Sequence, residues 1–259
     1  MIIDAHAHIW PSTSFSLKKF LKWASRLGID KLCVSELPSI RPSSLQSFTM
    51  ANRDVAKAMK AYPNVILGYC YVNPAYKEEA IREFRKCLEE YDMLGLKLYT
   101  DCHCLDSRVS PLIDLAAEFR APVLIHTAHL KRRHIEAVRP FHGNPPTVSN
   151  SEEVAELARR HPDATIIMAH IGGGGDWEWG LKAVRDVNNL MVDTSGSGVD
   201  MGMIELAVRE VGATRVIFGT DNCLSSGIGK IQGADLTDED RRLILEENML
   251  KIIERRGII

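Results

Sequence analysis

Two histidines separated by a single residue, His6 and His8, stand in an apolar segment near the N-terminus. Residues two apart in a β-strand face the same side, so both imidazoles would project together. Other ionisable side chains lie in or directly after later apolar runs, and these are Lys97, His126, His170 and Asp221. Imidazole nitrogens and carboxylate oxygens are ligands of zinc and of other divalent first-row metals. If the apolar runs are strands that end at one place, these residue types predict a metal site.

Short apolar or β-branched runs alternate with longer helical patterns along the chain, which is typical of βαβ units around a parallel sheet. The expected strands cover 2–8, 31–35, 65–71, 94–99, 122–126, 164–169, 190–193 and 215–219. The expected helices lie near 14–27, 45–61, 76–91, 110–119, 151–160, 177–187, 201–211 and 237–255. Eight such units in 259 residues match a closed α/β barrel. We therefore expect a single (β/α)8 TIM-barrel domain over residues 1–259.

The candidate residues fall at corresponding places in these units. His6 and His8 belong to the first strand and Lys97 to the fourth, while His126 closes the fifth. His170 closes the sixth strand, and Asp221 follows the eighth. In TIM-barrel enzymes the active site lies at the C-terminal ends of the strands. The metal site is accordingly expected at the C-terminal mouth of the barrel.

The composition is that of an ordinary globular protein and argues against some functions. The chain has 32 Lys and Arg against 34 Asp and Glu, for a formal net charge of -2. Nucleic acids are bound mainly through basic surfaces, so we expect a small-molecule substrate and no nucleic acid. No apolar run reaches the roughly 20 residues that cross a bilayer, and the N-terminus lacks a signal-peptide pattern. These features favour a cytoplasmic protein without a membrane partner, and a homodimer is the default expectation.

Longer segments surround the candidate residues. They are Ile-Asp-Ala-His-Ala-His at 3–8, Pro-Val-Leu-Ile-His at 122–126, the stretch 160–173 around His170, Val-Asp-Thr-Ser-Gly at 192–196 and Phe-Gly-Thr-Asp at 218–221. Together they resemble the amidohydrolase superfamily, and within it the amidohydrolase-related (amidohydrolase 2) branch of metal-dependent TIM-barrel hydrolases and decarboxylases. That branch includes lactonases and decarboxylases of the aminocarboxymuconate-semialdehyde type. Cys223 departs from the family pattern, which usually has proline there.

The resemblance implies a ligand set. It implies that His6, His8, His126 and Asp221 hold a divalent metal, for which zinc is the first expectation and manganese the alternative. His170 is then either a ligand of a second metal or a catalytic group beside the first. The number of metals stays open on the sequence alone.

Substrate contacts are expected from side chains near the strand ends. In some relatives a lysine at the place of Lys97 is carboxylated and bridges two metals. Lys97 is alternatively an anchor for a substrate carboxylate, or a lysine paired with a buried acid. The other expected contacts are Trp10, Arg132 and Ser195. Arg132 belongs to the long irregular segment 127–148, which is typical of an active-site lid.

The expected site chemistry begins with water. A divalent cation lowers the pKa of a bound water to about 7 in favourable sites and polarises a substrate carbonyl. The expected reaction is hydrolysis, by metal-activated water, of a small carboxylated or cyclic ester, lactone or amide, with Asp221 as general base and His170 stabilising the oxyanion. The alternative is non-oxidative decarboxylation of an unsaturated or aromatic acid, with protonation of a ring carbon before CO₂ leaves. A barrel that binds a metal and a ligand without turnover is the third interpretation.

Overall fold

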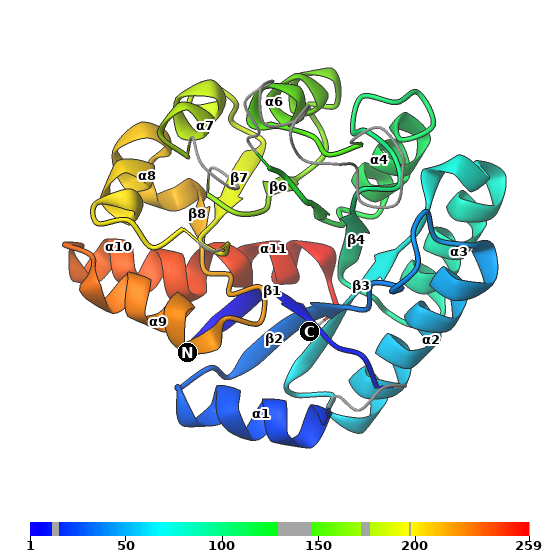
Figure 1. Cartoon of the computed structure of the whole chain (residues 1–259), viewed down its shortest axis with the longest axis horizontal. Coiled ribbons are helices and arrows are strands. Elements are labelled where there is room, and N and C mark those ends of the chain that lie inside the picture. The colour runs from blue at the N-terminus through cyan, green and yellow to red at the C-terminus, as the bar shows by residue number, and fades with distance from the viewer. Residues whose placement is uncertain (12–15, 129–146, 172–176, 197, 259) are drawn as a thin grey trace.

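The computed structural model describes residues 1–11, 16–128, 147–171, 177–196 and 198–258. Within these residues, eight strands form one sheet in the order β1 to β8, and each neighbouring pair is parallel. Helices alternate with the strands and surround them as an outer ring (Figure 1). The expected (β/α)8 barrel is confirmed. Arg132 lies outside the described residues.

The elements follow the expected order. The strands are β1 (Ile3–His8), β2 (Lys31–Ser35), β3 (Ile66–Tyr71), β4 (Gly95–Leu98), β5 (Val123–Ile125), β6 (Ile166–Met168), β7 (Leu190–Asp193) and β8 (Val216–Ile217). The helices between them are α1 (Leu17–Arg26), α2 (Leu45–Ala61), α3 (Glu78–Glu89), α4 (Ser110–Glu118), α6 (Ser151–Arg160), α7 (Trp177–Val184) and α8 (Met203–Val211). After β8 come α9 (Leu224–Gly233), α10 (Asp238–Arg242), a π-helical turn (Leu243–Glu247) and α11 (Asn248–Arg256).

Backbone hydrogen bonds join the first strand to the end of the last one. The Ala5 N–H donates to the Phe218 carbonyl at 2.8 Å, and the Asp221 N–H donates to the His6 carbonyl at 2.7 Å. Asp4 strengthens this seam, because its carboxylate accepts from both the N–H and the hydroxyl of Thr220. The seam therefore sets the position of Asp221 relative to the histidines of β1.

Alternate residues of each strand point to opposite sides of the sheet. Leu96 and Leu98 pack in the apolar layer shared with the helices, whereas Lys97 between them points into the barrel and contacts His6. A separate apolar cluster fills the interior and includes Cys33, Leu67, Tyr69, Leu124, Ile167 and Ile217, with Met249 of α11. The polar side chains at the C-terminal ends of the strands thus pack on this apolar cluster inside the barrel.

The segment after β8 differs from expectation. The sequence predicts one helix there, over 237–255, whereas the structure adds α9 directly after the Asp221 turn. Leu224, Ile228 and Ile231 are buried and have helical spacing, but interspersed glycine and serine weaken the helix pattern. One of these glycines is required, since a Cβ at Gly227 would lie 2.7 Å from the Thr220 side chain. Close packing of α9 against the turn after β8 therefore explains why this helix contains glycine.

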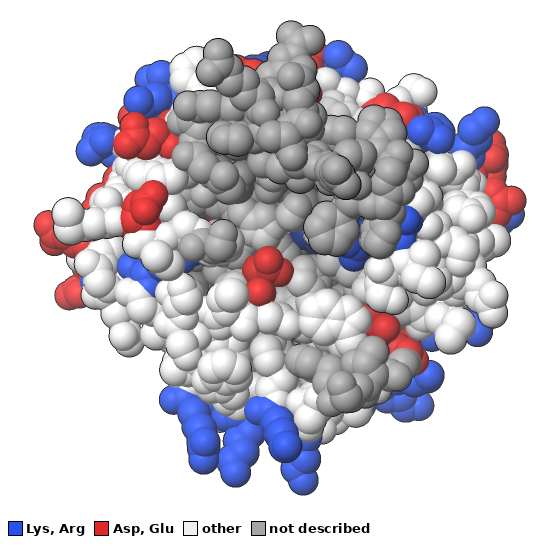
Figure 2. Space-filling model, viewed as in Figure 1, with Lys and Arg blue, Asp and Glu red and all other residues white. Residues whose placement is uncertain are grey.

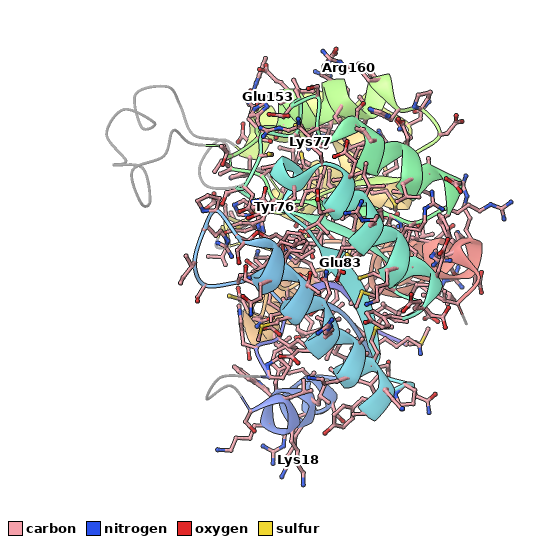
Figure 3. All side chains as sticks on the ribbon, turned by 90° about the vertical axis from the view of Figure 1, so that its right-hand side faces the viewer. Lys18, Tyr76, Lys77, Glu83, Glu153 and Arg160 are labelled. Atoms are coloured by element: carbon pink, nitrogen blue, oxygen red, sulfur yellow. The ribbon has the colours of Figure 1, made fainter. Side chains whose placement is uncertain are left out.

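The face of the molecule seen in Figure 2 carries both charges and includes a basic area. Figure 2 shows Lys and Arg side chains gathered over α1, where Lys18, Lys19, Lys22 and Arg26 are exposed and Phe20 faces the core. In Figure 3, Lys18 lies at the edge of the molecule and points away from it. Among the described residues, no helix has the length and apolar character needed to span a membrane.

Candidate active site

β1 supplies two imidazoles that face each other at the mouth of the barrel. The Nε2 atoms of His6 and His8 are 3.2 Å apart. Asp221, in the turn after β8, places Oδ1 3.1 Å from Nε2 of His8 and 3.8 Å from Nε2 of His6. One donor atom from each of these residues lies within 4.8 Å of the other two. The barrel thus brings together three residues of the expected ligand set.

Hydrogen bonds on the other side of each ring fix these imidazoles. Nδ1 of His6 lies 2.8 Å from Oδ2 of Asp193, at the end of β7. Nδ1 of His8 lies 2.9 Å from Oγ of Ser35, at the end of β2. A protonated Nδ1 that donates to these oxygens leaves Nε2 with a free lone pair. Metal-binding histidines are commonly oriented by an acceptor of this kind on the second ring nitrogen.

The facing atoms suit a divalent metal ion. Two nitrogen lone pairs directed at each other across 3.2 Å repel unless a cation or a proton lies between them. Two nitrogens that bind one ion at about 2.0 Å with tetrahedral geometry are about 3.3 Å apart. The separations among His6, His8 and Asp221 therefore fit shared coordination, and their donor atoms match those of catalytic sites that keep positions open for other ligands.

His126 and His170 form a second pair of imidazoles beside His6 and His8. Nδ1 of His126 lies 3.0 Å from Nε2 of His170, whose Nδ1 lies 2.8 Å from Oγ of Ser195. Within the described residues, the groups close enough to share an ion are His6 with His8 and Asp221, and His6 with His170 and Asp193. His126 contacts this cluster through His170. Its coordination of the first metal stays a prediction.

Two cationic side chains lie beside Tyr99, directly after β4. The Arg41 guanidinium, from the loop after β2, stacks on the Tyr99 ring 4.0 Å from its centroid. Nζ of Lys97 lies 6.0 Å from the same centroid and 3.1 Å from Nε2 of His6. Nε of Arg41 is buried and has no hydrogen-bond partner in the part of the chain that the structure describes. The mouth therefore offers cationic donors next to the candidate metal ligands.

The amidohydrolase family model matches residues 3–253. This chain belongs to the amidohydrolase family. The resemblance drawn from the sequence motifs is confirmed, and with it a metal-dependent enzyme of this fold. Among curated proteins, the comparison finds no match.

Several solved structures share this amidohydrolase fold. A 2,6-dihydroxybenzoate decarboxylase from Rhizobium has 17% identity and a TM-score of 0.74, with 99% of this chain and 98% of that chain covered. A dihydroxybenzoic acid decarboxylase from Polaromonas sp. JS666, with bound manganese and 2-nitroresorcinol, has 15% identity and a TM-score of 0.73, covering 92% and 86%. A 4-oxalomesaconate hydratase from Rhodopseudomonas palustris has 16% identity and a TM-score of 0.72, covering 98% and 96%. At these identities the likeness establishes the fold.

Residues of the amidohydrolase site adopt left-handed backbone conformations. The φ angles are 64° at His170, 49° at Asp221 and 65° at Asn222. Asparagine tolerates this region better than most residues. The Asn222 amide also accepts from the His8 N–H at 2.7 Å and donates to the His8 carbonyl at 2.8 Å. It thereby takes the place of a neighbouring strand and holds the end of β1 against the Asp221 turn.

Replacing Asn222 by alanine should weaken metal binding by about 10- to 100-fold, the usual effect of removing a group that orients metal ligands. The reason is that His8 loses both backbone hydrogen bonds that fix it relative to Asp221. Titration against a competing chelator would measure the change. Asn188→Ala, at an exposed residue before β7, is the matched control. Equal affinity in both variants would contradict this role for Asn222.

Burial controls the protonation of the cluster. It lowers the pKa of His6 to about 3 and lowers those of His8, His126 and His170 below their ordinary value. Burial alone would raise the pKa of Asp221, but its hydrogen bond with His8 and the neighbouring histidines hold it well below its usual range. Neutral imidazoles and an ionised carboxylate are the forms that bind metals. The protein therefore presents a ligand-ready cluster at neutral pH.

The same shifts predict steep acid destabilisation of the metal-free chain. In the unfolded chain these histidines bind protons below about pH 6.5, whereas the folded state resists protonation, so each costs about 1.4 kcal/mol per pH unit. Burial raises the pKa of Asp4 and that of Glu36 to about 7, which stabilises the folded state as the pH falls from 7 to 5 and offsets two of the four histidines. Urea unfolding with chelator at pH 7, 6 and 5 should show the decline. A His126→Gln variant should decline less steeply, and an unchanged slope would contradict this account.

The structure also places the expected substrate contacts. Trp10 donates its indole N–H to the Leu37 carbonyl at 3.0 Å, and its ring lies 6.0 Å from that of His8. Ser195 is only 2% exposed, and its Oγ contacts Asp193 and both His6 and His170. The hydroxyl is thus engaged in holding the imidazoles.

Several site residues were absent from the set expected from the sequence. Asp193 lies inside the barrel at the end of β7, so the alternation along that strand was a usable signal. Ser35 follows the same logic at the end of β2. Arg41 lies in an irregular loop, where no periodicity indicates the direction of a side chain.

Proposed function

We propose that this amidohydrolase-family protein is a metal-dependent, non-oxidative decarboxylase of a small, planar, carboxylated substrate. The observation that carries the proposal is the pair of cations at Tyr99. Arg41 has a buried Nε without a partner in the described chain, and Lys97 lies beside the candidate metal ligands. A buried cationic donor without a partner is costly, so an anionic group of the substrate is its natural complement.

The comparisons favour this reaction over the hydrolysis that was the first expectation. The Rhizobium and Polaromonas proteins are decarboxylases of dihydroxybenzoic acids. Manganese is bound in the Polaromonas structure, so manganese stands beside zinc as a metal to test. These are properties of the relatives, and they support the proposal only together with the cationic pair.

His6, His8 and Asp221 would hold the metal, with His126 as the further ligand implied by the family resemblance. When bound, the ion supplies positive charge that orients the substrate and stabilises negative charge as it develops. Arg41 and Lys97 would bind the substrate carboxylate or a neighbouring acidic group. Tyr99 lies beside His126 and Trp10 beside His8, so each would offer an aromatic ring near the mouth. Each of these groups favours an anionic, flat molecule.

The reaction needs one proton and releases one CO₂. Asp221, whose side chain is 35% exposed toward the mouth, would take a proton from a substrate hydroxyl or from solvent and deliver it to the ring carbon that bears the carboxylate. The bond between that carbon and the carboxylate then breaks, its electron pair returns to the ring, and CO₂ leaves. His170, held by Ser195 and paired with His126, would stabilise the charge that builds on the ring substituents.

The deciding experiment measures product and isotope together. The chain, loaded in turn with manganese and zinc, is incubated in D₂O with 2,6-dihydroxybenzoate, other ortho-hydroxylated aromatic acids, and a set of esters and lactones. The proposal predicts CO₂ release with one deuterium on the carbon that carried the carboxylate. Water-consuming cleavage of an ester or lactone without CO₂ would instead establish the hydrolase. Tight metal and ligand binding without any turnover would establish the non-catalytic barrel.

A further inference from the structure

The loop that carries Arg41 is held at both ends by side chains from other strand ends. Near its start, the Leu37 carbonyl accepts the indole N–H of Trp10 at 3.0 Å. Near its end, the Ser43 N–H donates to Oδ1 of Asp101 at 2.6 Å. Asp101 follows β4, as Tyr99 does. A loop without regular structure is thus tied to elements that form the barrel mouth.

Ser43 is the more strongly fixed end. Asp101 also accepts a hydrogen bond from the Tyr71 hydroxyl, and that hydroxyl oxygen lies 3.3 Å from Oγ of Ser43. The Asn73 side chain donates to the Ser43 carbonyl at 2.8 Å. Both backbone groups of Ser43 are therefore bound by side chains, and the residue is only 2% exposed. Buried backbone groups bound in this way leave little freedom to the residues beside them.

The segment after β4 consequently holds Arg41 at two points. Tyr99 contacts the guanidinium directly, while Asp101 binds the backbone two residues beyond Arg41. Lys97 belongs to β4 itself, so β4 and the residues directly after it present one cation and position the other. The positions of both cations therefore depend on a single short segment, 97–101.

We propose that Asp101 is a positioning residue that fixes Arg41 so that its guanidinium and the Lys97 ammonium form one carboxylate-binding subsite. This inference rests on the proposed function, because it assumes that the substrate presents a carboxylate to Arg41. Among the described residues, the hydrogen bonds of Asp101 go to Ser43 and Tyr71 and not to a candidate metal ligand, so Asp101 would act through Arg41. Its carboxylate acts by accepting two hydrogen bonds that a neutral, shorter side chain cannot accept.

The test compares two ligands that differ in one carboxylate. Calorimetry on the manganese-loaded chain measures the affinity for 2,6-dihydroxybenzoate and for resorcinol, which lacks the carboxylate. The wild type and every variant carry Asp221→Asn in this comparison, so that the acid is bound but not turned over. We expect Asp101→Ala to weaken binding of the acid about tenfold and to leave resorcinol binding unchanged. Arg41→Ala should weaken acid binding at least as much. The double variant should bind the acid no more weakly than Arg41→Ala alone, because residues that act as one unit are not additive.

Matched variants keep the test decisive. Asp106 lies further along the loop between β4 and α4, and its carboxylate pairs with Arg108. The Asp106→Ala variant should bind the acid as the wild type does. Asp101→Asn, which keeps an acceptor for the Ser43 N–H, should recover part of the loss. If Asp101→Ala does not fold, Tyr71→Phe removes one of the two hydrogen bonds and should give a smaller loss, again for the acid only.

The failures of the two proposals can be told apart. If the wild-type chain binds the acid no better than resorcinol, there is no carboxylate-binding subsite, and the role proposed for Asp101 is also wrong. If the wild type prefers the acid but Asp101→Ala retains that preference, only the positioning role of Asp101 is contradicted. Equal losses for acid and resorcinol, or additive losses in the double variant, also overturn it, because they indicate general damage or an independent action of Asp101.

Discussion

Replacing Asp221 by asparagine should reduce kcat of the metal-loaded enzyme by roughly 10³-fold, within the range that general acid–base groups contribute. Asparagine keeps an oxygen near Nε2 of His8, where the Asp221 carboxylate lies at 3.1 Å, but it has no carboxylate to accept a proton. The loss should therefore exceed any loss of metal. Initial rates with the best substrate of the panel, together with metal analysis of the same sample, separate the two effects.

The control for this variant lies in the same part of the chain. Asp235→Asn changes an exposed carboxylate after α9, outside the candidate site, and should leave kcat at the wild-type value. If Asp221→Asn retained full turnover with a full complement of metal, Asp221 would not be the proton carrier. If it lost its metal in proportion to its activity, its main role would be that of a ligand.

Removal of the metal by a chelator should reduce activity to background and lower the thermal stability markedly. An ion present at about 1,000 times its dissociation constant stabilises the folded state by about 4 kcal/mol. For a chain of this size that corresponds to a decrease in Tm of roughly 10 °C on removal. Scanning calorimetry before and after dialysis, followed by addition of manganese or zinc, measures the loss and its recovery.

Two histidine variants sharpen the metal experiment. His8→Ala should lack both the bound metal and the chelator-dependent shift in Tm, because its Nε2 lies between His6 and Asp221. His103→Ala changes a histidine that pairs with Glu153 at 3.0 Å, away from the cluster, and should behave as the wild type does. A metal content near one ion per chain would fit the cluster on β1, whereas two would extend it to His170 and Asp193. If the chain binds no divalent metal, the proposed function is wrong.

The fold was predictable because each unit repeats the same physical pattern. Apolar runs followed by amphipathic helices indicate parallel strands with crossovers, and the ends of such strands meet. This pattern places His6, His8 and Asp221 near one another from the sequence alone. The helix at 224–233 was not predicted. Close packing of Gly227 against Thr220 requires glycine there, and glycine has a poor helix propensity.

The site was predictable only in part, for a similar reason. Residue type and strand position identify which side chains reach the mouth, but they do not give the direction of a ring. The hydrogen bonds of His6 with Asp193 and of His8 with Ser35 depend on that direction. Arg41 depends on the path of a loop, which tertiary contacts at Ser43 determine. The choice between hydrolysis and decarboxylation is harder still, because both reactions use the same ligand types.

The seam between β1 and the turn after β8 also bears on how the chain matures. His8 and Asn222, which clasp each other there, are 214 positions apart. An ion shared by His8 and Asp221 would act as a cross-link between the two ends of the barrel, and closing so long a loop in the unfolded chain is worth roughly 5 kcal/mol by analogy with a disulfide. During synthesis the histidines of the first strand would leave the ribosome long before Asp221 does. Metal capture by this cluster would then mark the completion of the barrel.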